Sequence, residues 1–173
     1  MNKIIIYGSH YGTTKAYAEK LSELTGIPAI SYKQITDLTP YDEVIHLGGL
    51  YAGGVKGLKE TIRSLTPNAR LIVVTVGLAD VSKKENTDHI KKSVFKQVPQ
   101  PVLGQTTILH LRGGIDYSRL NFMHKTMMSL VYKKAKNTPE AEKTAEIRDL
   151  IETYQQKVDF TDFRSLQQVV DAI

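Results

Sequence analysis

Cysteine is absent from this chain of 173 residues, which excludes thiol catalysis, disulfide bonds and thiolate metal sites. Long hydrophobic runs are also lacking, because no stretch of about 18 apolar residues occurs that could span a membrane. Met1–Lys3 precede the first apolar run without the pattern of a signal peptide. The five histidines lack the spacing of metal ligands. We therefore expect a cytoplasmic protein without a metal site.

Acidic residues are scarce in one segment. The formal net charge is +5, and residues 112–136 contain six basic residues and a single acidic one. Because the other 17 basic and 17 acidic residues cancel, the positive charge is a local patch. The hydrophobic content of 41% is ordinary, and repeats, low-complexity tracts and linkers are lacking. At this length we expect one domain, residues 1–173.

Short apolar runs alternate with helical patterns along the first two thirds of the chain. Three of the runs are continuous Ile, Val and Leu, as expected for parallel strands that are covered on both faces. Helical stripes at Tyr17–Leu24, Leu58–Leu65 and Ile90–Val98 separate them. The alternation predicts an α/β fold with a doubly wound, five-stranded parallel sheet in the order 2-1-3-4-5. The predicted strands are Lys3–Tyr7, Ala29–Ser31, Glu43–Gly48, Leu71–Val76 and Thr106–Leu111.

About 60 residues follow the fifth strand, where one closing helix would complete such a fold. We therefore expect a helical insertion at about residues 112–157, before the last helix. Its first helix is predicted from about Ser118 to Lys136, and its second from Thr138 as N-cap, with Pro139 in the first turn. The closing helix is predicted to start near Thr161. The apolar stripes are Ile147, Leu150, Ile151, Tyr154 and Val158 in the second helix, and Phe163, Leu166, Val170 and Ile173 in the closing helix.

The stretch Ile4–Thr14 carries the clearest functional pattern. An apolar strand runs directly into a loop of small and hydroxyl residues, and this loop opens a helix at Thr14. Backbone N–H groups, hydroxyls and the positive end of the helix dipole converge there, and no carboxylate lies between Met1 and Lys15. Open α/β sheets bind nucleotides at this first turn, so the sequence predicts a phosphate site. A turn without ligand, with a threonine capping the helix, is the alternative.

Two common phosphate-binding patterns do not match this loop. The Walker pattern requires Gly-Lys-Ser/Thr, and the dinucleotide pattern requires glycines two and five residues apart, whereas Gly8 and Gly12 are four apart. The loop resembles instead the signature of the flavodoxin family, over roughly residues 1–111. The resemblance implies that hydroxyls and amides hold the phosphate of FMN. The implied phosphate-binding residues are Ser9, His10, Tyr11, Gly12, Thr13 and Thr14, and Tyr11 is a departure because threonine is commoner there.

The loops after the third and fourth predicted strands extend the resemblance. The third strand ends in four glycines around a Leu-Tyr pair, which lets the backbone approach a flat ligand. The resemblance implies that the two loops flank the isoalloxazine ring of FMN. The implied residues are Leu50, Tyr51, Ala52 and Gly53 in the first loop and Gly77, Leu78, Ala79 and Asp80 in the second. As alternatives, Tyr51 packs on a neighbouring helix and Asp80 caps the next helix.

The predicted insertion carries a second resemblance. Leu111-Arg112, Tyr117, Arg119, the Met-rich basic helix and Thr161-Asp162-Phe163 resemble the menaquinone-dependent protoporphyrinogen dehydrogenases, which are flavodoxin-like enzymes of haem synthesis. The chain also lacks the strong acidity of ordinary flavodoxins. The resemblance implies an FMN-dependent oxidoreductase that transfers electrons from protoporphyrinogen or another hydrophobic donor to a quinone.

The first insertion helix, residues 119–136, combines apolar and basic side chains. One face is predicted to pack in the core, and its residues are Leu120, Met123, Met127, Leu130 and Val131, with His124 and Met128 at the margin. Three interpretations fit the basic face: peripheral contact with anionic lipid, binding of porphyrin propionates, and solvation without a partner. The residues predicted for a substrate or membrane surface are Arg112, Arg119, Phe122, Lys125 and Lys133.

Three hypotheses of function follow from the sequence. The first is an FMN-dependent oxidoreductase with a small hydrophobic substrate, the second a soluble FMN electron carrier with a redox partner, and the third a binding module without flavin. No nucleic-acid binding is expected, since the patch lacks a stacking platform or recognition helix. No catalytic side chain is identified, because the flavin would supply the chemistry. We expect His46 to be buried and hydrogen-bonded, and a bound dianion to favour protonation of His10.

Overall fold

The computed structural model describes residues 1–51 and 54–173, apart from the side chains of residues 145 and 146. Five parallel strands form the central sheet in the order β2-β1-β3-β5-β6, and the short strand β4 pairs antiparallel with β3. This order confirms the prediction, because β5 and β6 are the fourth and fifth parallel strands. The strands are β1 (Lys3–Gly8), β2 (Ala29–Ser31), β3 (Glu43–Tyr51), β4 (Gly54–Val55), β5 (Arg70–Gly77) and β6 (Thr106–Arg112).

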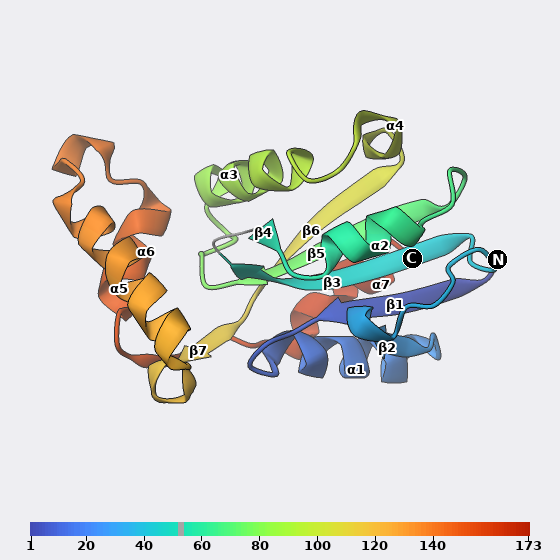
Figure 1. The fold of residues 1–173 in the computed structure, drawn as a ribbon, viewed down its shortest axis with the longest axis horizontal. Helices are drawn as coiled ribbons and strands as arrows, with labels where there is room; N and C mark the ends of the chain where they lie inside the picture. Colours follow the sequence, from blue (N-terminus) through green and yellow to red (C-terminus); the bar gives the residue numbers. More distant parts are fainter. Residues whose placement is uncertain (52–53) are drawn as a thin grey trace.

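Helices cover both faces of the sheet (Figure 1). One face packs against α1 and the C-terminal segment, and the other against α2 and α3. The α-helices are α1 (Thr13–Thr25), α2 (Leu58–Ser64), α3 (Lys84–Phe95), α4 (Gln100–Leu103), α5 (Phe122–Asn137), α6 (Ala145–Thr153) and α7 (Gln167–Val170). The 3-10 helices are η1 (Tyr32–Gln34), η2 (Tyr117–Arg119), η3 (Glu140–Glu142) and η4 (Phe163–Leu166).

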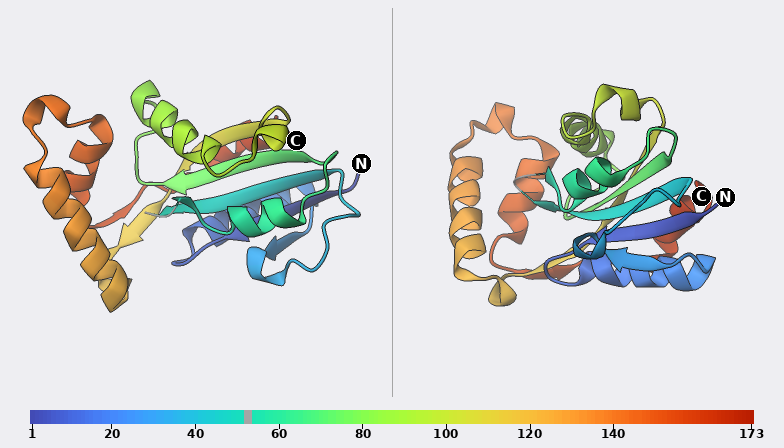
Figure 2. Two further views of the ribbon diagram at one scale, coloured as in Figure 1. Left: turned by 45° about the horizontal axis from the view of Figure 1, so that its top comes forward. Right: turned by 45° about the vertical axis from the view of Figure 1, so that its right-hand side comes forward.

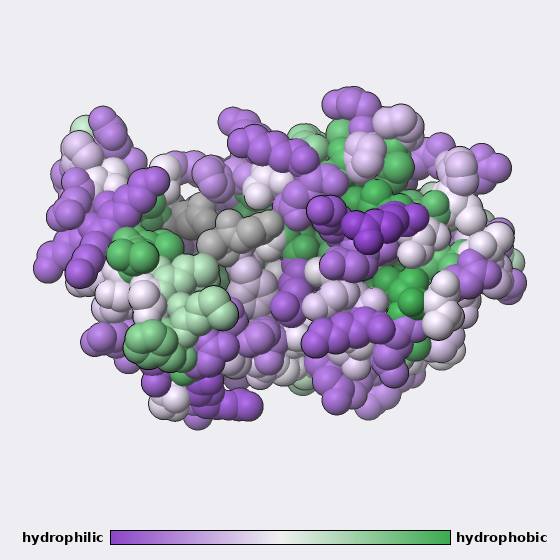
Figure 3. All heavy atoms as spheres, in the orientation of Figure 1, coloured by the Kyte–Doolittle hydropathy of each residue, from purple (hydrophilic) through white to green (hydrophobic). Residues whose placement is uncertain are grey.

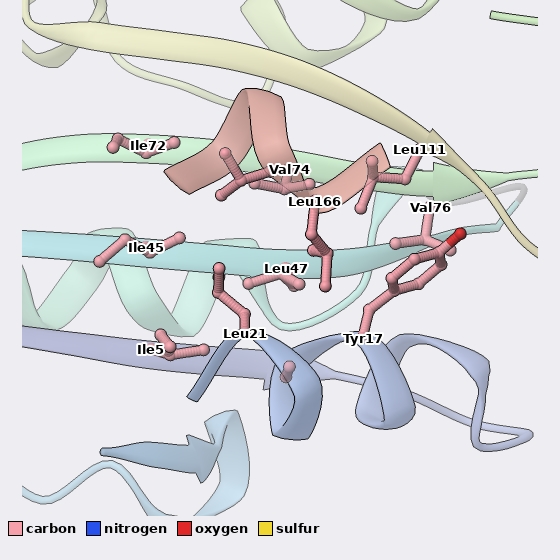
Figure 4. Close-up of a cluster of buried hydrophobic side chains, with 12 residues drawn as sticks. Ile5, Tyr17, Leu21, Ile45, Leu47, Ile72, Val74, Val76, Leu111 and Leu166 are labelled. Atoms are coloured by element: carbon pink, nitrogen blue, oxygen red, sulfur yellow. The ribbon is translucent and has the colours of Figure 1, made fainter. Parts of the chain in front are cut away.

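The continuous apolar runs are explained by the two cores. Successive side chains of a strand point to opposite faces, so Ile5 packs with α1 whereas Ile4 and Ile6 pack toward α2. Figure 4 shows the first core, where Tyr17 of α1 and Leu166 of η4 meet inward-facing side chains of β3 and β5. Because both faces are covered, no polar alternation is needed along these strands.

The carboxyl ends of the parallel strands point toward the insertion, and the two chain termini lie at the opposite end of the sheet (Figures 1 and 2). A two-stranded antiparallel sheet of β7 (Gly114–Asp116) and β8 (Lys157–Asp159) forms the base of the insertion. The helices α5 and α6 stand beyond it, past the edge where the ligands of open parallel sheets bind.

The helices of the insertion begin and end at residues other than those predicted. The first helix begins at Phe122 rather than Ser118, because the Asn121 side chain accepts a hydrogen bond from the N–H of His124 (2.8 Å). Thr138 is not an N-cap, since its hydroxyl donates to the carbonyl of Lys134 (2.9 Å) at the end of α5. Thr144 caps α6 instead.

Two apolar stripes were also predicted correctly only in part. Val158 belongs to β8 rather than to the second helix, since the helix ends at Thr153. In the closing segment, Phe163 is 43% exposed, whereas Leu166 and Val169 are buried in the core. The closing segment starts as the 3-10 helix η4, and Val169 rather than Val170 is fully buried in α7. Val170 and Ile173 are partly buried against the core, and Phe163 contacts the ring of Tyr17.

Candidate functional site

The loop between β1 and α1 presents unused backbone donors. Gly12 precedes the helix in the left-handed conformation (φ 102°), and no side chain caps the helix at this position. The first helical hydrogen bond runs from the N–H of Ala16 to the carbonyl of Gly12 (2.9 Å), so the N–H groups of residues 13–15 precede it. The threonine cap of the alternative interpretation is therefore wrong, since Gly12 occupies the N-cap position. Ser9 accepts from the N–H of Gly12 (3.1 Å), which holds the loop in a tight turn.

A cavity of about 620 Å³ lies at the carboxyl ends of the strands. Its size falls within the usual range of ligand pockets. Most of the predicted cofactor-binding residues line it: Ser9, Tyr11, Thr13, Thr14, Leu50, Tyr51, Gly77, Leu78 and Ala79. His10, Gly12 and Asp80 are not among its lining residues, and Ala52 and Gly53 lie outside the described residues. The structure therefore brings together side chains from all three predicted loops.

Two glycines leave room for the side chains of Leu50 and Tyr51, and Gly77 lets the β5 loop approach the β3 loop closely. A Cβ atom on Gly77 would lie 2.9 Å from Cδ1 of Leu50, and one on Gly49 would lie 2.9 Å from Cε2 of Tyr51. Larger residues at either position would displace these two side chains. The glycines thus set the width of the cavity between the β3 and β5 loops.

Arg112 holds the loop that follows β5. Its guanidinium donates to the carbonyl of Leu78 through Nε (3.2 Å) and Nη2 (2.9 Å). The guanidinium also lies 3.7 Å from the ring centroid of Phe160, a cation–π contact. Arg112 was predicted for a substrate or membrane surface, but it is a half-buried clamp between the sheet and the base of the insertion.

Asp80 shapes the turn before α3. Its carboxylate accepts hydrogen bonds from the N–H (3.0 Å) and hydroxyl (2.7 Å) of Ser82, which lower the pKa of the Asp80 carboxyl. The N-cap position of α3 is Lys83, so the prediction that Asp80 caps this helix is wrong. The helix begins one turn later because the chain first closes the Asp80–Ser82 turn.

The insertion forms the wall of the cavity opposite the sheet. Apolar side chains of α5 and α6 line this wall: Met127, Met128, Val131, Ile147 and Leu150. The predicted core face was wrong in part, since Met123 is 71% and Leu130 63% exposed. The helix faces a cavity rather than a packed core, so only Ala135 of α5 is buried. Periodicity identified Met127 and Val131 but not their role as cavity wall.

The other residues predicted for a substrate or membrane surface lie away from the cavity. Arg119, Phe122, Lys125 and Lys133 are exposed, and Phe122 is 86% exposed. Figure 3 shows hydrophobic and hydrophilic side chains side by side on the surface of the insertion.

His124 joins the insertion to the predicted phosphate loop, a contact that the sequence did not reveal. Its Nδ1 is hydrogen-bonded to the hydroxyl of Tyr11, and its ring stacks on Tyr51 with centroids 6.3 Å apart. The ring of His10 lies 4.6 Å from that of His124. Tyr51 therefore packs on a neighbouring helix and lines the cavity at once, so its two predicted roles are compatible.

Two further histidines are buried in the sheet. His46 is bonded through Nδ1 to the hydroxyl of Thr61 (2.9 Å) and through Nε2 to the carbonyl of Lys56 (3.0 Å), which confirms the prediction for His46. His110 is bonded to Thr75 (2.7 Å). Burial lowers the pKa of each histidine to about 4, so both are neutral near pH 7. Neither histidine lies among other potential metal ligands, since no cluster of three such residues occurs in the described chain.

None of the helices in residues 1–51 and 54–173 combines the length and apolarity needed to cross a bilayer. A comparison with curated protein sequences gave no match. Solved structures that match this chain include flavodoxin 1 from Bacillus cereus (13% identity, TM-score 0.41), over 65% of this chain and 86% of its own. A flavodoxin from the Archaea has 14% identity and a TM-score of 0.40, over 65% of this chain and 85% of its own. A mutant flavodoxin from Fusobacterium nucleatum bound to flavin mononucleotide has 12% identity and a TM-score of 0.41, over 70% of this chain and 73% of its own.

The sequence itself gives the family. The model of the Flavodoxin domain family matches residues 4–142, which include β1 to β6 of the sheet, the three loops at its carboxyl edge and α5 of the insertion. The chain therefore belongs to the flavodoxin domain family.

Proposed function

We propose that the cavity at the carboxyl edge of the sheet binds FMN and that the protein transfers electrons through it. The observation that carries this proposal is the cavity itself, which brings three loops from separate parts of the chain around about 620 Å³. Membership of the flavodoxin domain family supports the same ligand. FMN, when bound, supplies the redox chemistry, and the protein supplies binding, orientation and electrostatics.

The phosphate of FMN fits the loop between β1 and α1. The free N–H groups of the first turn of α1, together with the hydroxyls of Ser9, Thr13 and Thr14, offer uncharged donors to a dianion. No carboxylate lies among residues 1–15, so nothing in this loop repels the phosphate. Because no side chain caps the helix, these backbone N–H groups are available to donate hydrogen bonds to the phosphate.

The ring of FMN fits between the loops after β3 and β5. Leu50 and Tyr51 offer apolar and aromatic surface on one side, and Gly77–Ala79 offer backbone groups on the other. Arg112 fixes the carbonyl of Leu78, so the remaining polar groups of that loop are held in place before a ligand binds. We propose Asp80 as a contributor through its backbone, because its carboxylate is engaged with Ser82.

An apolar donor is proposed because the insertion lines the far side of the cavity with methionine and aliphatic side chains. Such a wall favours an enzyme that oxidises protoporphyrinogen or another hydrophobic donor and passes electrons to a quinone. The second candidate is an FMN electron carrier that serves a redox protein partner, which the family membership favours. In both candidates, the clamp of Arg112 places a positive charge beside the β5 loop.

The insertion surface is proposed to contact the cytoplasmic face of an anionic membrane. Phe122, Met123 and Leu130 are exposed on α5 among lysines, a combination that suits the interface of a lipid bilayer. Leu130→Ser should reduce co-sedimentation with anionic vesicles, whereas the matched change Leu24→Ser, at an exposed leucine on α1, should not. The proposed contact would be contradicted if the two variants bound equally well and neither distinguished anionic from neutral vesicles.

The test of FMN binding is a titration of the purified protein, followed by absorption and thermal unfolding. The wild type should turn yellow and gain thermal stability, because a ligand that binds the native state stabilises it. Thr13→Val should weaken binding by about tenfold, the effect of one lost hydrogen bond to a charged group. The control Thr36→Val, at an exposed threonine remote from the cavity, should bind as the wild type does. A colourless wild-type protein without stabilisation would overturn the proposal.

Redox titration separates the enzyme from the carrier. Few carboxylates face the cavity and Arg112 stands beside it, so the anionic reduced ring should form more readily than in acidic flavodoxins. Arg112→Gln should lower the second reduction potential, whereas Arg63→Gln, on the exposed face of α2, should leave it unchanged. A very low second potential in the wild type, without oxidation of any hydrophobic donor, would favour the carrier.

A further inference from the structure

A second, smaller hollow of about 260 Å³ adjoins the main cavity. It lies where three elements meet: the loop between β1 and α1, the β3–β4 hairpin and α5. Its lining includes His10, Tyr51, Val55, Lys56, His124 and Met127. Four residues line both spaces, so the two adjoin each other: Tyr51, Gly54, His124 and Met127.

Basic groups converge on this hollow from three separate parts of the chain. The rings of His10 and His124 lie 4.6 Å apart, and Nζ of Lys56 lies 5.7 Å from the ring centroid of Tyr51. Tyr51 in turn lies against both histidines, at 6.2 Å from His10 and 6.3 Å from His124. Among the described lining residues there is no carboxylate to neutralise these groups.

The described groups that line the hollow or act on His10 are basic or uncharged. Tyr11 bonds to His124 from the phosphate loop, Tyr51 and Lys56 face them from the β3–β4 hairpin, and Lys33 lies beyond in η1. Partial burial lowers the pKa of His10, and the charges of His124, Lys56 and Lys33 lower it further. An anion placed here would reverse the electrostatic part of that shift, because it favours the protonated imidazole.

We propose that this hollow binds an oxyanionic group, such as a carboxylate, carried by an apolar molecule whose body lies in the main cavity beside Met127. The two histidines and Lys56 bind the oxyanion through charge-assisted hydrogen bonds. Tyr51 forms the wall of the hollow beside these three side chains. This inference rests on the proposed function, because the molecule is the hydrophobic electron donor. It adds the place where an acidic donor is held, with its charged end oriented toward His10.

The phosphate of FMN is also an oxyanion, so it is a second candidate ligand for the hollow. We assign that phosphate to the first turn of α1, where the N–H groups of residues 13–15 lie free of a cap. The hollow is then open to another anion while FMN is bound. Competition between FMN and a test anion would show that both use the same position.

The experiment is a titration of the FMN-saturated protein with 2-naphthoate, an apolar carboxylate, and with its uncharged methyl ester. Binding is followed by calorimetry in two buffers of different ionisation enthalpy and by the NMR signals of the His10 and His124 rings. The carboxylate should bind about tenfold more tightly than the ester, the difference that one charge-assisted contact gives. Its affinity should rise as the pH falls, with uptake of protons, because the anion favours the protonated form of His10.

Matched variants locate the site. Lys56→Met and His10→Gln should each weaken naphthoate binding by about tenfold and leave the ester unaffected. Lys59→Met, which removes an exposed lysine of α2 three residues away, should change neither. Titration shifts of both histidine rings that vanish in Lys56→Met would place the anion in the hollow.

Three outcomes would overturn the inference. Equal affinity for acid and ester would show that the charge is not recognised, and binding without proton uptake would exclude the histidines. Displacement of naphthoate by FMN would show that the hollow is the seat of the flavin phosphate. The titration is also run on the FMN-free protein, so a failure of FMN to bind would refute the proposed function separately from this site.

Discussion

The sheet and the insertion use the same apolar residue types in opposite ways. Leu47 in β3 is fully buried between α1 and the neighbouring strands, whereas Leu130 in α5 is 63% exposed. In the sheet, each apolar side chain meets others from several elements. In the insertion, the apolar side chains of α5 divide between a cavity and the surface, and only Ala135 is buried. The comparison teaches that apolar side chains of the sheet stabilise the fold by burial, whereas those of α5 line a cavity or face solvent.

The largest effect should come from matched truncations in the two regions. Leu47→Ala should lower the free energy of unfolding by about 2–5 kcal/mol, because it leaves a cavity in a packed core. Leu130→Ala should change it by less than about 0.5 kcal/mol, since the side chain already contacts water. Urea unfolding of both variants measures the difference. A similar loss in the two proteins would mean that α5 packs against something in solution and is not a free face.

The second effect is acid destabilisation of the sheet through its buried histidines. His46 and His110 have pKa values of about 4 in the folded protein, against about 6.5 in the unfolded chain. Between these values the unfolded chain binds more protons, so stability falls as pH falls, by up to about 1.4 kcal/mol per pH unit for each histidine. Below about pH 4 the loss from each is complete, at about 3 kcal/mol.

His46→Gln tests this origin. The amide removes one titrating group while keeping a hydrogen-bonding side chain beside Thr61, so the decline of unfolding free energy between pH 7 and about pH 5 should be roughly halved. Denaturant unfolding at several pH values measures the slope. Surface carboxyls with lowered pKa values, such as Asp162, lose their contribution to the unfolding free energy only below about pH 4. They therefore do not affect the slope between pH 7 and about pH 5. An unchanged slope in the variant would assign the acid sensitivity elsewhere.

The fold of the sheet could be predicted because its information is local. Runs such as Ile4–Ile6 and Leu71–Val76 are short, continuous and β-branched, and the loops between them leave no other connection than parallel crossovers. The loop between β1 and α1 could equally be predicted as a turn that opens a helix, because Ser9 and Gly12 interact within the loop itself. Strand ends were extended only by one to three residues, as with β3, which continues to Tyr51.

The insertion could not be predicted to the same depth, because its contacts are distant. Tyr11 and His124, 113 residues apart, meet only in the folded chain, and so do Arg112 and Leu78. Helical periodicity assumes that one face is buried, which failed for Met123 because the helix borders a cavity and solvent. Thr138 and Thr144 are both good capping residues. The hydroxyl of Thr138 bonds back to Lys134, whereas that of Thr144 accepts from the N–H of Ile147, and only the folded chain shows this difference. The stripe on α1 likewise failed at Leu24, which lies exposed in the last turn of the helix.

A third effect should come from the hydroxyl that joins the two regions. Tyr17 donates to the carbonyl of Arg112 (2.7 Å) and accepts from the N–H of Asp162 (2.9 Å), so it ties together the two chain segments that enter and leave the insertion. Tyr17→Phe keeps the buried ring and removes both bonds, which should cost about 1–3 kcal/mol of unfolding free energy. Amide exchange of Asp162 should accelerate more than that of β3. A uniform change across the sheet would show that the hydroxyl supports the core rather than the junction.

The smallest effect should come from within the insertion. The rings of Tyr132 on α5 and Tyr154 after α6 stack with centroids 3.9 Å apart and 7° between their planes, a pair worth about 0.5–1.5 kcal/mol. Tyr154→Leu keeps apolar volume but removes the stack, so α5 and α6 should open locally more often, and their amides should exchange faster.

The contrast between regions decides how that result is interpreted. Should only the amides of α5 and α6 respond, the insertion opens as a unit of its own while the sheet stays closed, and apolar ligands can enter the cavity by that route. If the amides of β3 and β5 respond equally, the wall and the sheet unfold together, and entry must pass between the β3 and β5 loops instead. Because α5 has few buried side chains, we expect the first outcome.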